Sequence, residues 1–269
     1  LTLEVESQGL EVTKSQPGKW RLEGKPSGFT VLKVSDINPD DPPRHFRLWL
    51  PGRPEVSTTF HPAFLEKLKP FGTLRFMDWM ETNHSPIRTW EDRPRRDDFT
   101  WMKQGVPLEV MIELANALDA TPWFCMPERA DDDFLFAFAT MTLQQLDEEL
   151  TCIVEYSNEV FNGSFSVYRH AERMGEVLSL VDPAEASELT DREVRFLHRH
   201  RYQGLRSAQI AGAWKTVFVQ SPERVEVVVT GDAEVLETAL SLPSENSETV
   251  ADQVDRLAEN SYWGFQLVK

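Results

Sequence analysis

The sequence has few cysteines, no long apolar segment and fewer basic than acidic residues. Only Cys125 and Cys152 occur among 269 residues, each inside a predicted strand, so we expect two buried free thiols rather than a disulfide framework. No apolar run approaches the roughly 20 residues of a membrane-spanning helix, so no membrane partner is expected. With 28 Lys and Arg against 44 Asp and Glu, the net charge of −16 would repel nucleic-acid phosphates. We therefore expect no nucleic-acid partner.

Motifs for cofactors, metals and a nucleophilic serine are also missing. The segment Pro51-Gly-Arg-Pro54 after the first strand of the main domain lacks the glycine pattern of a phosphate-binding loop. No serine stands in a nucleophile-elbow pattern. His84 and His170 have no partners at metal-ligand spacing. Asp131-Asp-Asp133 starts a predicted helix, where carboxylates cap amides, and His198-Arg-His-Arg201 indicates a solvated helix surface. We expect neither cofactor nor metal.

Residues 1–43 differ from the rest of the chain. Apolar and polar residues alternate there over short segments separated by Gly, Pro and Ser, which is typical of antiparallel strands. The segments are Leu3–Glu6, Gly9–Thr13, Trp20–Glu23 and Phe29–Val34. We interpret them as a small N-terminal β-sandwich-like segment. The run Asn38-Pro-Asp-Asp-Pro-Pro43 then predicts a linker, and residues 44–269 form the second predicted domain.

From residue 44 the sequence alternates between strand and helix patterns. Predicted strands occupy 46–50, 73–79, 122–126, 224–229 and the stretch from Thr151, with a sixth near 254–262. Predicted helices occupy 62–71, 107–118, 132–146, 192–219, 234–242 and 250–257. Strict alternation indicates an α/β fold with a parallel sheet. About six βα units fit either an open doubly wound sheet or a (β/α)8 TIM-type barrel. Since the phosphate-loop pattern is absent, the sequence favours the barrel, incomplete at its C-terminal end.

Polar and aromatic residues collect where the predicted strands end. In a barrel these ends carry the function, and tryptophans beside carboxylates and amides suit a sugar ring with its apolar faces and hydroxyls. The alternative is that the tryptophans are packing residues. The candidate substrate-binding residues are Asp78, Trp79, Asn83, His84, Trp123, Glu128 and Trp263.

The stretch Thr151–Asn162 contains the strongest candidate. It begins as an apolar, β-branched strand and ends in Asn158-Glu159, so a carboxyl and an amide are expected at the mouth of the strand. Arg75 lies inside a predicted strand, where a charge needs a partner, and an inward position close to Glu155 would supply one. The alternatives are that Glu159 only caps or salt-bridges the next loop and that Arg75 faces the surface.

Several of these runs resemble a known family. Glu155-Tyr-Ser-Asn-Glu159 resembles the acid/base strand of retaining glycoside hydrolases of the large (β/α)8 clan that includes cellulases and mannanases. Further runs resemble bacterial cellulose-binding or hydrolase-like proteins that have a β-sandwich ahead of such a barrel. These runs are Leu74–Trp79, Trp90–Arg93, Gly105–Glu109 and Arg201–Gln203.

The resemblance implies roles for four residues. Glu159 matches the acid/base glutamate, Asn158 the amide before it, Arg75 a second-strand arginine, and Tyr262 a sixth-strand tyrosine that contacts the nucleophile. The sequence departs from the family at Phe161, where tryptophan is usual. It also shows no seventh strand, on which the family places its nucleophile, so we expect that group to be missing from this chain.

Two functions remain open. The resemblance implies a retaining glycoside hydrolase acting on a β-linked polysaccharide or oligosaccharide, in a secreted or periplasmic protein. The alternative is a non-catalytic carbohydrate-binding protein on a degenerate barrel, and an unrelated α/β enzyme is a third reading. The sequence identifies neither the glycan nor the oligomeric state.

Overall fold

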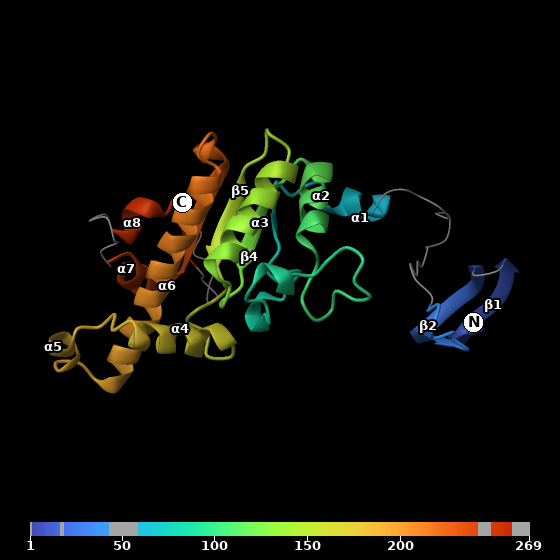
Figure 1. Cartoon of the computed structure of the whole chain (residues 1–269), viewed down its shortest axis with the longest axis horizontal. Coiled ribbons are helices and arrows are strands. Elements are labelled where there is room, and N and C mark those ends of the chain that lie inside the picture. The colour runs from blue at the N-terminus through green and yellow to red at the C-terminus, as the bar shows by residue number, and fades with distance from the viewer. Residues whose placement is uncertain (1, 17–18, 43–58, 242–248, 260–269) are drawn as a thin grey trace. The chain divides into compact units, whose positions relative to one another are not determined.

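The computed structural model describes residues 2–16, 19–42, 59–241 and 249–259. The chain divides into two units, Leu1–Ser57 and Thr58–Lys269, each of which is described by itself (Figure 1). The domain boundary predicted between residues 43 and 44, and the strand predicted at 46–50, lie on residues outside these described ranges.

The first unit contains one antiparallel pair of long strands, β1 (Thr2–Gln16) and β2 (Lys19–Ser35). The antiparallel strands predicted for residues 1–43 are present, but as two long strands and not as four short ones. The register of β1 against β2 shifts between Glu6 and Gln8 and again between Gln8 and Leu10, and Gly9 takes a φ of 87° at this place. These bulges bend β1 without ending it. Each β-bulge therefore looked like a turn between separate strands.

The second unit contains eight α-helices and five strands in its described residues. The helices are α1 (Pro62–Leu68), α2 (Leu108–Leu118), α3 (Asp132–Gln145), α4 (Ser166–Val177), α5 (Pro183–Ala186), α6 (Asp191–Val217), α7 (Ala233–Leu240) and α8 (Val250–Gln253). The strands are β3 (Thr73–Arg75), β4 (Thr121–Met126), β5 (Cys152–Tyr156), β6 (Val225–Gly231) and β7 (Arg256–Glu259).

The five strands form one parallel sheet in the order β3-β4-β5-β6-β7. Sequential order with right-handed crossovers places the connecting helices on one face and curls the sheet. The predicted (β/α)8 barrel is contradicted, because the described strands form an open, curled half-barrel whose edges are β3 and β7. The predicted strand 73–79 also ends early: β3 stops at Arg75, and the Met80 amide bonds back to the Phe76 carbonyl in a turn.

The two faces of the sheet have opposite chemistry. Leu74, Phe124, Val154 and Val227 point to the helices and belong to the main hydrophobic core. Helix α3 contacts both α2 and α6, and the sheet is contacted by α2 at β4 and by α6 at β5 and β6. Figure 1 shows α3 in front of β4 and β5. The other face, called the open face below, carries the alternate residues of the same strands. Its polar and aromatic members are Arg75, Trp123, Glu155, Glu226 and Thr230.

Capping groups fix where the helices begin. The Asp131 side chain accepts a hydrogen bond from the Phe134 amide at the start of α3, which confirms capping as the role predicted for this acidic run. Thr190 and Glu193 form a capping box at the start of α6. Helix α4 was not among the helices predicted from the sequence.

The surface predicted for residues 198–201 of α6 is partly wrong. His200 is fully buried and Arg199 is nearly so, with the Arg199 guanidinium bonded to Glu172 of α4. A helix of this length is covered on several sides, here by α3, α4 and α7. Gly204 permits the approach of α7, since a Cβ at that position would collide with the Ala239 carbonyl.

Candidate functional site

A buried carboxylate, Glu155, is the centre of the open face. Its side chain is 1% exposed. Oε2 accepts hydrogen bonds from Arg75 Nη2 at 2.7 Å and from Trp123 Nε1 at 2.9 Å. Oε1 accepts from Thr230 Oγ1 at 2.8 Å. These partners come from β3, β4 and β6, so one side chain of β5 connects four adjacent strands. Burial of the charge is compensated by one cation, Arg75, and two neutral donors, Trp123 and Thr230.

The contact between Arg75 and Glu155 confirms the partner predicted for Arg75, although the Arg75 side chain is still 32% exposed. The parallel register explains it, since Arg75 pairs with Trp123, and Cys125 pairs with Glu155, which places alternate side chains of three strands on one face. The Arg75 guanidinium also lies 5.1 Å from the Trp123 ring centroid. The role that the family resemblance gives to Arg75 in catalysis stays a prediction.

Asn158 extends this network to the loops at the carboxyl end of the sheet. It is 2% exposed, and its Oδ1 accepts from Arg75 Nη2 at 2.9 Å. Its Nδ2 donates to Asn83 Oδ1 at 2.8 Å. Asn83 belongs to the short 3-10 helix η1 (Thr82–His84). Arg75 and Asn83, predicted within and after the second strand, therefore form one hydrogen-bonded chain with Asn158, predicted at the end of the strand from Thr151.

Glu159 follows in a strained turn. Ser157 and Glu159 have φ values of 55° and 44°, in the left-handed region that non-glycine residues rarely adopt. Such strain is concentrated at functional sites. Glu159 is 7% exposed, so its side chain is not directed into bulk water, and its Oε2 accepts from Asn162 Nδ2 at 2.8 Å. The turn thus sets a buried carboxyl beside the end of β5.

A third buried carboxyl, Glu128, lies after the end of β4. It is 2% exposed, and its two oxygens are held by different partners. Ser166 Oγ lies 2.8 Å from Oε2, and Arg129 Nε lies 3.0 Å from Oε1. Ser166 Oγ is also 2.9 Å from the Asn83 carbonyl, which connects Glu128 to the loop that holds Asn158.

The remaining predicted residues have mixed positions. Asp78 and His84 are exposed, and the His84 ring meets the edge of Phe165. Trp79 is half-buried and packs against Phe64 and Phe76, which is the packing role left open for it above. Tyr262 and Trp263 lie outside the described residues.

Sequence reasoning missed Thr230 and the part played by Cys125. Thr230 interrupts the run Val227-Val-Val229 at the end of β6, and strand alternation places it on the same face as Val228, which pairs with Glu155. That alternation was the available signal. The Cys125 thiol lies 3.4 Å from Glu155 Oε2, and burial, together with this carboxylate, raises the pKa of Cys125 well above its usual value. Cys125 and Cys152 are both free and buried, as predicted.

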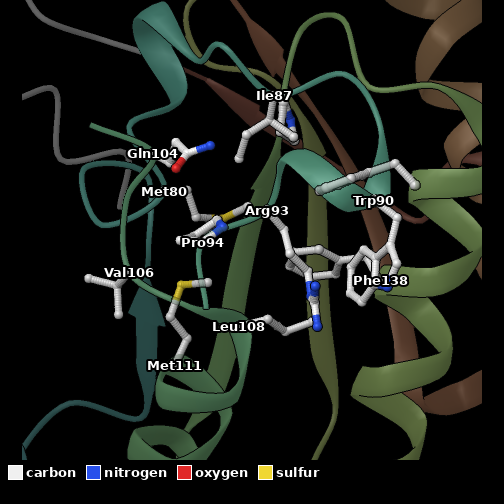
Figure 2. A pocket seen from close by; sticks show the side chains of 12 residues that line it. Met80, Ile87, Trp90, Arg93, Pro94, Gln104, Val106, Leu108, Met111 and Phe138 are labelled. Carbon is white, nitrogen blue, oxygen red and sulfur yellow. The ribbon is translucent and has the colours of Figure 1, made fainter. Parts of the chain in front are cut away.

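A small cavity lies on the helix-covered side, away from this network. It has a volume of about 20 Å³, room for about one water molecule. Figure 2 shows Trp90, Arg93, Leu108 and Phe138 around it. Arg93 Nε is buried without a hydrogen-bond partner among the described residues, which suits an ordered water. A sugar ring does not fit there, so the cavity does not compete with the open face as a glycan site.

The described ranges contain no cluster of three or more His, Cys, Asp or Glu side chains arranged to hold a metal ion. Within the same ranges, no helix has both the length and the apolar character needed to cross a membrane.

No family model, curated protein or solved structure matches this chain significantly. The fold and the site therefore define a class only: an α/β protein with an open parallel sheet, in which a partly exposed arginine binds a buried carboxylate and a buried amide near the carboxyl ends of the strands.

Proposed function

We propose that the open face binds a β-linked glycan and that Glu159 is the general acid that cleaves it. The observation that supports this most is the double contact of Arg75 Nη2 with Glu155 and Asn158. It fixes an amide and its neighbouring carboxyl at the carboxyl end of β5. An amide in that position suits a sugar hydroxyl, and a buried carboxyl suits protonation of a glycosidic oxygen.

Hydrolysis of this kind needs a second carboxyl group near the first. Asp78 and Glu128 are the candidates among the described residues, because both follow strands that end at the same edge as β5. Asp78 is exposed, whereas Glu128 is buried between Ser166 and Arg129. Their relative importance is tested with Asp78→Asn and Glu128→Gln.

A non-catalytic glycan-binding protein is the second candidate. It is favoured by the protein partners of the buried carboxylates: both oxygens of Glu155 and of Glu128 accept from protein groups, and Glu159 accepts from Asn162. Carboxylates held in this way stabilise the shape of a site without requiring that they react.

The two candidates are separated by one set of measurements on the full chain. Release of reducing ends from soluble β-glucan and β-mannan is measured together with binding by calorimetry. The hydrolase proposal expects turnover that falls at least about 100-fold in Glu159→Gln while binding is retained. The control is Glu148→Gln, an exposed carboxyl at the amino end of β5, which should change neither. Binding without turnover supports the second candidate, and turnover unaffected by Glu159→Gln rejects the assigned role.

A further inference from the structure

The loop of residues 95–104, called the Phe99 loop, exposes two large apolar side chains. Phe99 is 92% exposed and Met102 is 85% exposed, and partly buried Trp101 stands between them in sequence. A single exposed apolar residue needs no explanation. Two such side chains within one ten-residue loop, next to an indole in sequence, offer apolar groups to a ligand at one place on the chain.

Hydrogen bonds hold the Phe99 loop in this conformation. Trp101 Nε1 donates to the Arg95 carbonyl at 3.1 Å, and the Arg95 amide donates to Asp98 Oδ2 at 2.7 Å. The Gly105 amide donates to the Trp101 carbonyl at 2.9 Å. Gly105 has a φ of 88°, and a Cβ there would collide with the Trp79 carbonyl. Glycine therefore lets the C-terminal end of the loop pack closely against the backbone at Trp79. The apolar side chains are therefore presented on an ordered backbone, which lowers the entropy lost on binding.

The Phe99 loop lies at the same end of the sheet as Glu159. Strands β3 and β4 are parallel, so α2 between them must run back from the carboxyl end to the amino end of the strands. The connection that precedes α2, including this loop, is consequently at the carboxyl end. Figure 1 shows it as the teal loop that projects beside α2. Asn83 and Asn158 mark the same end.

We propose that Phe99 and Met102 form an outer glycan-binding surface, which takes additional sugar rings of a chain whose cleaved or central unit lies beside Glu159. This inference rests on the proposed glycan function and specifies an extended glycan as its ligand. A phenyl face stacks on the C–H face of a pyranose, and a thioether adapts to the ring beside it. A glycan is favoured over an anionic membrane surface, because the net charge of −16 opposes approach to anionic lipid.

The test compares short and long ligands on the full chain. Dissociation constants are measured by calorimetry for disaccharides and hexasaccharides of β-1,4-linked glucose and mannose, with wild type, Phe99→Ala and Phe71→Ala. Phe71 is the matched control, since it is 57% exposed and precedes β3 at the amino end of the sheet. Loss of one stacking contact should weaken hexasaccharide binding about five- to ten-fold in Phe99→Ala, with little change for the disaccharide. Phe71→Ala should change neither.

The outcomes distinguish this inference from the function on which it rests. Hexasaccharide binding that is equal in wild type and Phe99→Ala overturns the outer surface but leaves glycan binding intact. Absence of binding to all four sugars in wild type overturns both. Flotation with vesicles of phosphatidylcholine and anionic phosphatidylserine that is lost in Phe99→Ala, with unchanged sugar affinity, assigns the loop to a lipid surface and also overturns the proposal. Both substitutions affect exposed side chains, so normal folding is expected and is checked by circular dichroism.

Discussion

The two faces of the parallel sheet are built from alternate residues of the same strands but follow different rules. Phe124 and Trp123 are neighbours on β4. Phe124 is fully buried and packs against Phe76, Phe138 and Trp214 beneath the helices. Trp123, on the open face, is only half-buried and uses its indole nitrogen to bind Glu155. One face gains stability from packed apolar volume, and the other from paired charge.

This difference separates folding from function within one sheet. On the helix-covered face the side chains of β4 and β5 are apolar apart from the Tyr156 hydroxyl and the Cys152 thiol, and both of these residues are buried. The open face joins Glu155 and Arg75 to Asn158 and so to the loops at the carboxyl end. Substitutions on the first face should chiefly change the free energy of unfolding, and those on the second should also change binding.

The largest effect is expected from Phe124→Ala compared with Trp123→Ala. Phe124→Ala leaves a cavity in the core and should lower the free energy of unfolding by about 3–5 kcal/mol. Trp123→Ala removes a half-buried ring and one hydrogen bond, and should lower it by about 1–2 kcal/mol. Urea unfolding followed by circular dichroism measures both. Equal losses would show that the two faces contribute to stability in the same way.

A smaller effect, about 2 kcal/mol, is expected from acid and should come from the helix side. His200 of α6 is fully buried, and its Nδ1 lies 2.9 Å from Gln203 Oε1. Burial lowers the pKa of His200 to about 4, against the partly opposing effect of the bond to Gln203. His200 takes up a proton near pH 6.5 in the unfolded chain but only near pH 4 in the folded chain. This contribution to stability is therefore complete above about pH 6.5 and is lost as the pH falls toward 4.

His200→Gln is the variant that isolates this contribution. Between pH 7 and pH 4.5, wild type should lose roughly 2 kcal/mol more stability than the variant does, because glutamine has no proton to take up. Urea unfolding at the two pH values measures the difference. Parallel losses in the two proteins would mean that His200 stays neutral or gains a partner in acid.

Much of the second unit was predictable because its patterns are local. Helix periodicity placed α2, α3 and α6 to within a residue or two, and apolar runs placed β4, β5 and β6. Closure of the sheet was not predictable in this way, since it depends on pairing between strands far apart in sequence. The prediction of a barrel rested on counting βα units and on a missing phosphate loop, neither of which reports the pairing of an edge strand.

The candidate site was predictable only in part for the same reason. Arg75 in an apolar strand indicated a buried partner, because an unpaired charge there is too costly, and Glu155 supplies that partner. Thr230 and Ser166 lie 75 and 38 residues from their carboxylate partners. Alternation along β6 indicates which face Thr230 occupies but not its partner, and nothing local marks Ser166. The αL conformation of Glu159 also has no sequence signal, because glutamate rarely adopts it.

The charge pairing of the open face is tested by Glu155→Gln, which keeps the side-chain volume. The loss of an ionic partner for Arg75 should lower the free energy of unfolding by about 1.5–3 kcal/mol. Glu226→Gln is the matched control on the same face, since Glu226 pairs with Arg256 across β6 and β7 where both side chains are more exposed. Its loss should be under about 1 kcal/mol. If both variants lose the same amount, burial of Glu155 adds nothing to the strength of its interactions.

The smallest and most local effect concerns the two thiols, one on each face. Burial raises the pKa of Cys152 to about 12 and that of Cys125 well above its usual value, where Glu155 adds to the effect. A raised pKa means less thiolate, so neither thiol of the native wild type should react appreciably with Ellman's reagent at pH 8. Glu155→Gln removes the nearby negative charge and loosens the open face around Cys125 while leaving the helix-covered face intact. Labelling should therefore accelerate at Cys125 but not at Cys152, as followed by mass spectrometry of the labelled peptides. Equal acceleration at both would indicate global unfolding instead, and would mean that the two faces do not respond independently.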